Sequence, residues 1–376
     1  MMHKPAPNSE RPDFNVALNG YRGLCALFVF VFHVGSAGVA DWPVDSLGFD
    51  ATGYLWSSLT YGVEMFFMIS GFVILGSLLR HRTVSGFLKD RFVRIYSAWV
   101  PALVAVTLVC VIYRMEAFAL TTPLESLLLF LGNLLLLPPI FPLRMIHQVS
   151  WSLSYEWVFY LTAAAGLILW RRNPRHPLLL ALWALLAALF ICLFPRALFF
   201  LTGVLVFRYR DWFVSHAKWL RLPLLSLLLF LVAWRATGAL KAHLTLTLFD
   251  FVADGRWIAV VVAFLASVHM FASVCLNASR QTAFLHSASF QFLGTISYSF
   301  YLWHTVAMAV VKRIIIPDVV PEFGAGVGVV VFAISSLAIS LPLSWLSWFV
   351  FEVKLAKLAR KRLAPRPALG RVARAA

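Results

Sequence analysis

The sequence predicts an all-α protein: a polytopic transmembrane helix bundle of about ten spans, with both termini in the cytoplasm. Of the 376 residues, 61% are hydrophobic and 13% are charged, and the mean hydropathy is +0.84. Soluble domains are roughly 45–50% apolar and ~25% charged, so this chain needs lipid around it. Apolar runs of spanning length recur along it, and its positive charges favour alternate connecting segments.

A helix needs ~20 apolar residues, within a range of ~17–25, to cross a bilayer. We predict spans at 18–38, 60–79, 95–113, 151–170, 178–194, 197–208, 222–237, 257–277, 291–312 and 325–350. The sixth run is short, which predicts a broken helix. The run 124–139 has 16 residues and ends in a Pro pair, so it is either an eleventh span or a re-entrant segment.

The charge distribution supports ten spans. With the N-terminus inside, 23 Lys and Arg residues fall in cytoplasmic segments and eight in outer segments, and Arg22 at the inner mouth of the first span completes the 32. This asymmetry follows the positive-inside rule. An eleventh span would turn Arg171, Arg172 and Arg175 outward, so we expect 124–139 not to cross. The net charge of +16 therefore indicates topology, and nucleic acid is not an expected partner.

We divide the chain into a cytoplasmic N-terminal segment (1–17), a transmembrane domain (18–353) and a basic cytoplasmic tail (354–376). The tail is expected to be attracted to anionic membrane lipids. The polar N-terminus shows no signal-peptide pattern. The four cysteines lie in apolar runs without paired or metal-ligand spacing, so we predict no metal site.

Two polar residues stand in the first span, YRGLCALFVFVFHVG. Eleven residues advance an ideal helix by ~1100°, so Arg22 and His33 share one face, separated axially by ~16 Å. Ionisable residues inside a bundle often mark a functional site. The alternative is a snorkelling arginine and a hydrogen-bonded structural histidine.

Further polar residues stand at the start of the third span and within the fourth. Arg91 and Arg94 are three residues apart, so they share a helix face and suit a phosphate-bearing ligand from the cytosol, or else only anchor the topology. Glu156 stands in an aromatic stretch and needs a partner, for which we expect His33. At the end of the last span, Glu352 stands beside Lys354 and is expected to act as a structural cap or to form a pair.

The second and ninth spans add small and polar residues. Ser70 and Gly71 lie mid-span, where small residues let helices pack closely. Tyr301 and His304 are neighbours on one helix face, in a stretch whose aromatic residues also suit a lipid interface. Glu64 lies near the outer end of the second span and gives only a weak signal.

In this order the motifs LNGYRGLCALFVFVFH, GVEMFFMISGF, RFVRIY, WSLSYEWVFYL, GTISYSFYLWH and FVFEVK resemble the acyltransferase-3 family of integral-membrane acyltransferases. They run from residue 18 to 354, essentially the whole chain. The most specific is the spacing of Arg22 and His33, with ten residues between them. The sequence departs from the usual pattern at Asn19, Tyr21, Ser97 and Trp157.

The resemblance implies a stand-alone O-acyltransferase in the bacterial cytoplasmic (inner) membrane. Its donor would be cytoplasmic acyl-CoA, foremost acetyl-CoA, and its acceptor a hydroxyl of an envelope or secreted carbohydrate. The expected catalytic residues are His33 as general base, Arg22 and Glu156, and the expected donor contacts are Arg91, Arg94, Ser70 and Tyr301. An imidazole with an ordinary pKa of ~6.5 suits the work of a base. The oligomeric state is left open.

A second class of function fits some of the same residues. Ionisable groups inside a bundle also mark transport pathways, so His33 and Glu156 would be proton-relay groups of a glycan or lipid-precursor exporter. The absence of an inverted-repeat signal weighs against transport. Thiol release from acyl-CoA separates the two classes, because a transporter performs no thioester chemistry.

Overall fold

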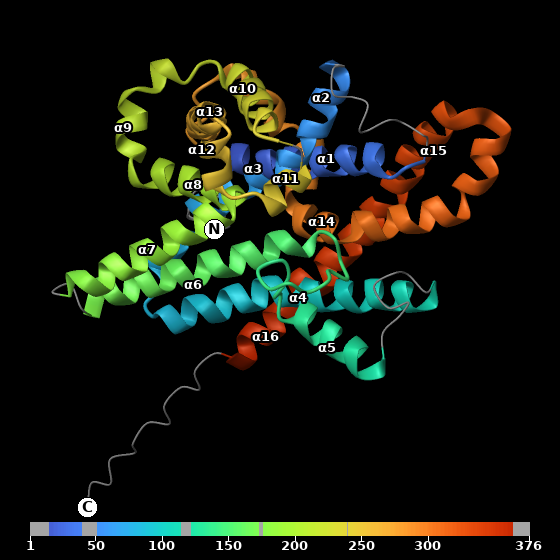
Figure 1. Cartoon of the computed structure of the whole chain (residues 1–376), viewed down its shortest axis with the longest axis horizontal. Helices are drawn as coiled ribbons and strands as arrows, with labels where there is room; N and C mark the ends of the chain where they lie inside the picture. The colour runs from blue at the N-terminus through green and yellow to red at the C-terminus, as the bar shows by residue number, and fades with distance from the viewer. Residues whose placement is uncertain (1–14, 40–50, 114–121, 173–175, 239, 364–376) are drawn as a thin grey trace, which may run out of the picture.

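The computed structural model describes residues 15–39, 51–113, 122–172, 176–238 and 240–363. Within these ranges the chain is helical and contains no strand (Figure 1), which confirms the all-α prediction. Most of the predicted N-terminal segment, and the tail beyond 363, lie outside the described residues.

Each of the ten predicted spans coincides with a helix. They are α1 (Val16–Ser36), α3 (Gly62–Arg80), α4 (Val84–Ile112), α6 (Ser150–Arg172), α7 (Pro177–Leu193), α8 (Leu198–Arg208), α10 (Pro223–Ala236), α13 (Trp257–Cys275), α14 (Ala288–Ile314) and α15 (Ile316–Ser347). Shorter elements join them: α2 (Ala51–Ser58), η1 (Leu59–Tyr61), α5 (Pro123–Leu134), η2 (Pro195–Ala197), α9 (Arg210–Ser215), η3 (Ala217–Trp219), α11 (Leu240–Thr245), α12 (Leu248–Ala253), η4 (Arg280–His286), the π-helix η5 (Trp348–Leu355) and α16 (Ala356–Leu363).

Fewer than ten of these helices can cross a membrane by length and composition. Six are long and apolar enough within the described residues, and a seventh is counted if α7 and α8, bent by 118°, form one broken span. Helix α10 has 14 residues and reaches only ~21 Å, short of the ~30 Å hydrocarbon core. Helix α14 is long but carries polar residues along its length. The structure therefore supports a multi-pass bundle, and the count of ten and its orientation stay predictions.

Two segments were predicted to be irregular. The sixth run is a continuous helix, α8, and the chain instead bends by 118° before it, between α7 and α8, so the predicted break lies before the sixth run and not inside it. In the run 124–139, helix α5 has 12 residues, ends at Leu134 and reaches ~18 Å, which is too short to span. This length agrees with a non-spanning segment.

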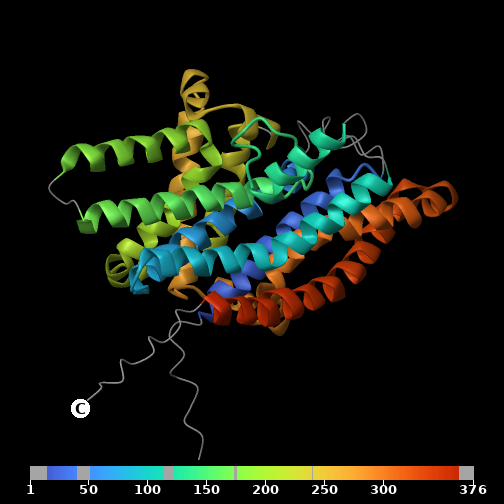
Figure 2. The same ribbon diagram turned by 90° about the horizontal axis from the view of Figure 1, so that it is seen from below.

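The bundle is built from closely packed pairs of helices. The most extensive contacts join α1 with α14, α14 with α15, α3 with α8, and α10 with α13 (Figure 2). Glycines permit the close contact of α3 with α8: a Cβ atom at Gly71 would lie 2.1 Å from the Phe200 carbonyl oxygen, and one at Gly203 would lie 2.0 Å from that of Met68. The close packing expected around Gly71 is therefore present.

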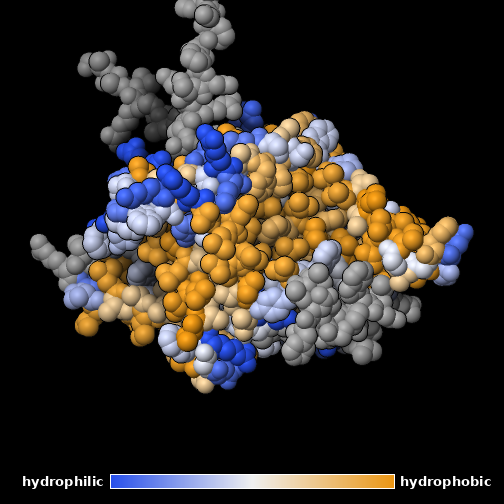
Figure 3. All heavy atoms as spheres, turned by 90° about the horizontal axis from the view of Figure 1, so that it is seen from above, coloured by the Kyte–Doolittle hydropathy of each residue, from blue (hydrophilic) through white to orange (hydrophobic). Residues whose placement is uncertain are grey.

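Large apolar side chains cover the outside of the molecule. On α7, Leu178 and Leu185 are 83% and 64% exposed, and Leu265 on α13 is 62% exposed. Figure 3 shows a broad apolar face with hydrophilic residues gathered mainly along one margin. Such a surface is suited to lipid, since large exposed apolar areas are unusual on soluble monomers.

Candidate active site

Five helices contribute to one cavity of about 130 Å³ inside the bundle, lined by both charged and apolar side chains. Six of the seven predicted site residues line it: Arg22 from α1, Ser70 from α3, Arg91 and Arg94 from α4, Glu156 from α6 and Tyr301 from α14. Residues up to 279 positions apart in the chain thus meet in one place. The seventh residue, His33, does not line this cavity.

Glu156 is held by hydroxyl groups. The Ser70 hydroxyl donates to its Oε1 atom over 2.8 Å, and the Tyr160 hydroxyl, one helical turn further along α6, donates to the same oxygen. The predicted pairing of Glu156 with His33 is therefore wrong. The reason is geometric: Glu156 faces the cavity together with Arg22, whereas His33 lies further along α1 and faces another partner.

Arg94 has a carboxylate partner that the sequence did not suggest. Its Nη1 atom lies 3.0 Å from Oε2 of Glu352, whose side chain is only 3% exposed. Glu352 also accepts from the backbone N–H and the hydroxyl of Ser299. Of the two expected roles of Glu352, the pair with Lys354 is wrong, because the Lys354 ammonium lies 4.3 Å from the centre of the Phe349 ring instead.

The other two cavity arginines have no carboxylate partner among the described residues. Arg22 makes no hydrogen bond or ion pair with a described side chain, and the Nε atom of Arg91 is buried without a hydrogen-bond partner. Three guanidinium groups therefore face two carboxylates, Glu156 and Glu352. The surplus positive charge suits an anionic ligand such as a phosphate group.

His33 lies outside the cavity and is connected to it through His304 and Tyr301. Its Nδ1 atom is 2.8 Å from the Val29 carbonyl oxygen and 3.3 Å from Nε2 of His304. His304 in turn lies beside Tyr301, with 6.1 Å between the ring centres, and Tyr301 lines the cavity. The histidine and the cavity are thus connected through α14, and Arg22 and His33 stand at different depths along α1 as the helical spacing predicts.

Two hydroxyl groups of the cavity already have acceptors. The Ser70 hydroxyl donates to Glu156. The Tyr301 hydroxyl donates to the Val149 carbonyl oxygen over 3.0 Å and also lies 2.8 Å from the Ser152 hydroxyl. In this arrangement they hold neighbouring elements together.

Comparison with protein families agrees with this geometry. Residues 15–348 match the acyltransferase-3 model, described as an acyltransferase domain. The chain belongs to the acyltransferase-3 family. Comparisons with curated proteins and with solved structures give no match. The match covers every helix that lines the cavity, so the cavity lies within the acyltransferase domain of a multi-pass membrane protein.

Outside the cavity, this acyltransferase has a buried ion pair that sequence reasoning missed. Nε and Nη2 of Arg196 donate to the two carboxylate oxygens of Glu64 over 2.6 and 2.7 Å, and both side chains are fully buried. The Trp234 indole also donates to Glu64, and the Arg196 guanidinium lies 4.0 Å from the centre of the Trp151 ring. The available signal is that Arg196 stands between two apolar runs, where the predicted topology counts it among the eight cations of the outer segments.

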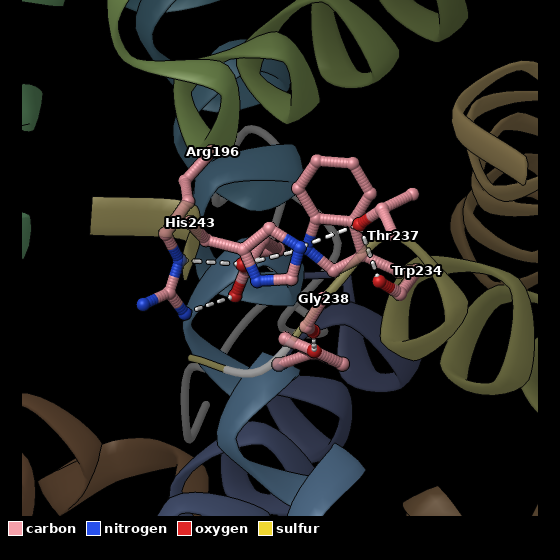
Figure 4. A network of polar contacts seen from close by, with 7 residues as sticks. Arg196, Trp234, Thr237, Gly238 and His243 are labelled. Atoms are coloured by element: carbon pink, nitrogen blue, oxygen red, sulfur yellow. Dashed lines mark hydrogen bonds and ion pairs between the residues drawn. The ribbon is translucent and has the colours of Figure 1, made fainter. Parts of the chain in front are cut away.

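The surroundings of this ion pair are shown in Figure 4. His243 stacks on Trp234 with 4.5 Å between the ring centres, and its Nε2 atom is 2.6 Å from the Thr237 hydroxyl. Because Glu64 belongs to α3, Arg196 to η2 and Trp234 to α10, the pair joins three elements of the family domain.

Proposed function

We propose that this family member is a membrane O-acyltransferase that moves an acyl group, foremost acetyl, from cytoplasmic acyl-CoA to a hydroxyl group of an envelope or secreted carbohydrate. The observation that carries the proposal is the meeting of Arg22, Arg91 and Arg94 with Glu156 in one cavity. A neutral substrate has no need of three guanidinium groups in a bundle interior, where charge is costly. A CoA thioester carries several phosphate groups.

The donor enters from the side on which Arg91 stands, near the start of α4. The phosphates bind at Arg91 and Arg94, and the narrow pantetheine arm continues into the bundle. On α1 the ~16 Å between Arg22 and His33 gives the length that this arm has to cover. The acyl carbon then passes Tyr301 and reaches His33.

His33 acts as the general base on the acceptor. Its imidazole takes the proton of the acceptor hydroxyl as the oxygen attacks the thioester carbonyl. The tetrahedral intermediate collapses, the C–S bond breaks, and the CoA thiolate takes the proton back from the imidazolium. Glu156 keeps Ser70 and Tyr160 in place beside the donor and offsets part of the arginine charge.

The test is acyl transfer from labelled acetyl-CoA by purified protein, with release of the CoA thiol measured in parallel. His33→Ala should lose transfer by at least about a hundredfold, the usual contribution of a general base. Full transfer by a correctly inserted His33→Ala protein refutes the base assignment. Acceptor movement without thiol release indicates the transporter instead.

The donor site is tested with a matched pair of arginines. Arg91→Ala should raise the KM for acetyl-CoA about tenfold, ~1.4 kcal/mol. Arg208→Ala removes an exposed arginine that is predicted to lie on the same side of the membrane but does not line the cavity. Equal KM values for both variants would mean that Arg91 does not bind the donor and only helps to set the orientation of the helix in the membrane.

A further inference from the structure

The histidine pair outside the cavity suggests a specific role for His304. His304 is 1% exposed, and its ring centre lies 5.0 Å from that of His33. The two rings lie among apolar ones: Phe32 is 5.2 Å from His33, and Phe300 is 5.9 Å from His304, centre to centre. Among the described residues, no carboxylate is hydrogen-bonded to either histidine.

Hydrogen-bond partners assign the proton positions on both rings. The Nδ1 atom of His304 lies 2.9 Å from the Phe300 carbonyl oxygen. A carbonyl oxygen can only accept, so Nδ1 of His304 carries the proton and Nε2 of the neutral ring is an acceptor. The Nδ1 atom of His33 then faces two acceptors, the Val29 oxygen and Nε2 of His304. It must therefore be the protonated nitrogen of His33.

This tautomer leaves the lone pair of His33 on Nε2, which makes no hydrogen bond to a described residue. Nε2 is thus the atom available to take a proton. When it does, the positive charge of the imidazolium is shared through the Nδ1–H group with Val29 and His304, and hydrogen bonds from charged donors are stronger than those from neutral ones.

We propose that His304 is the positioning residue of the His33 base: together with the Val29 carbonyl oxygen, its Nε2 lone pair holds the proton on Nδ1 and stabilises the imidazolium, as the carboxylate of a catalytic triad does for its histidine. The inference rests on the proposed function of His33. The remaining histidine nearby, His147, is engaged elsewhere, since its Nε2 donates to the Leu302 carbonyl oxygen over 2.9 Å and its ring packs against Trp99.

Two substitutions separate positioning from packing. His304→Leu fills the space with an apolar side chain of similar size but removes the hydrogen-bond acceptor. The kcat should then fall about tenfold or more, while the KM for acetyl-CoA changes less than about twofold. His304→Gln restores an acceptor oxygen and should recover part of kcat. His286→Leu, at an exposed histidine, is the control.

Nitrogen-15 NMR of protein with labelled histidines detects the contact between His33 and His304 and does not depend on acyl transfer. Wild type should show His33 protonated at Nδ1, with a coupling across the hydrogen bond to Nε2 of His304. A His33 protonated at Nε2, or wild-type kcat in His304→Leu, overturns the inference. An equal loss of kcat in the Leu and Gln variants also overturns it. If His33→Ala keeps full transfer, the proposed function fails, even where NMR still detects the pair.

Discussion

Removing one partner of the buried pair of Arg196 and Glu64 should destabilise this protein far more than removing one partner of an exposed ion pair. We consider Arg196→Met, which keeps an unbranched side chain of similar length but removes the charge. Glu64 then loses two hydrogen bonds and, among the described residues, keeps the one from Trp234. The contact of the guanidinium with Trp151 at 4.0 Å is lost as well.

The magnitude follows from the burial of both partners. Their side chains are 0% exposed, so the remaining carboxylate has no access to water. Removing one partner of a buried pair costs about 3–5 kcal/mol, mostly because the other charge is left uncompensated. Replacing both, as Glu64→Leu with Arg196→Met, should cost clearly less than the sum of the single changes, since no unpaired charge is left.

Unfolding can be followed through the protein's own cysteines. Cys25, Cys110 and Cys275 are buried, so they should react with a thiol-specific fluorophore only after unfolding in a detergent titration. Asp254→Asn is the matched control: the pair of Asp254 with Arg256 has a 2.9 Å contact but is 46% and 38% exposed, so its loss should cost ~0–1 kcal/mol.

Two results would refute this reasoning. Arg196→Met could unfold at the same denaturant level as Asp254→Asn, which would mean that burial adds nothing to the pair. The two single costs could also add fully in the double variant, which would mean that Glu64 and Arg196 are not coupled.

Two further predictions concern packing and pH. Gly203→Ala should unfold ~1–3 kcal/mol more easily in the same assay, because its Cβ atom would lie 2.0 Å from the Met68 carbonyl oxygen, whereas Gly326→Ala, with no atom within 4 Å, should not be destabilised. Hydrogen bonds from the backbone and hydroxyl of Thr247 hold the pKa of Asp250 below its ordinary value, so its contribution to stability is complete above that value and is lost as pH falls through the lowered one. In Asp250→Asn, the free energy of unfolding should therefore fall less steeply as the pH is lowered. An unchanged pH dependence would mean that other carboxylates cause the loss of stability in acid.

The sequence was sufficient to predict the long helices and most of the residues that line the cavity. Apolar runs of about 20 residues are helical in lipid because every backbone polar group must be bonded within the chain. Polar residues in such runs face the bundle interior because lipid excludes them. These two rules placed a helix at each expected segment. Together with the family resemblance they singled out seven site residues, of which Arg22, Ser70, Arg91, Arg94, Glu156 and Tyr301 line the cavity and His33 does not.

The partners of these residues could not be predicted from the sequence. Glu156 bonds Ser70, 86 positions away, Arg196 bonds Glu64, 132 positions away, and Arg94 bonds Glu352, 258 positions away. Helical periodicity tells which face a side chain occupies but not which helix stands opposite, because that depends on how the whole bundle packs. Hence the depth of His33 along α1 could be derived from its spacing to Arg22, whereas its contact with His304, 271 positions away, follows only from the packing of α1 against α14.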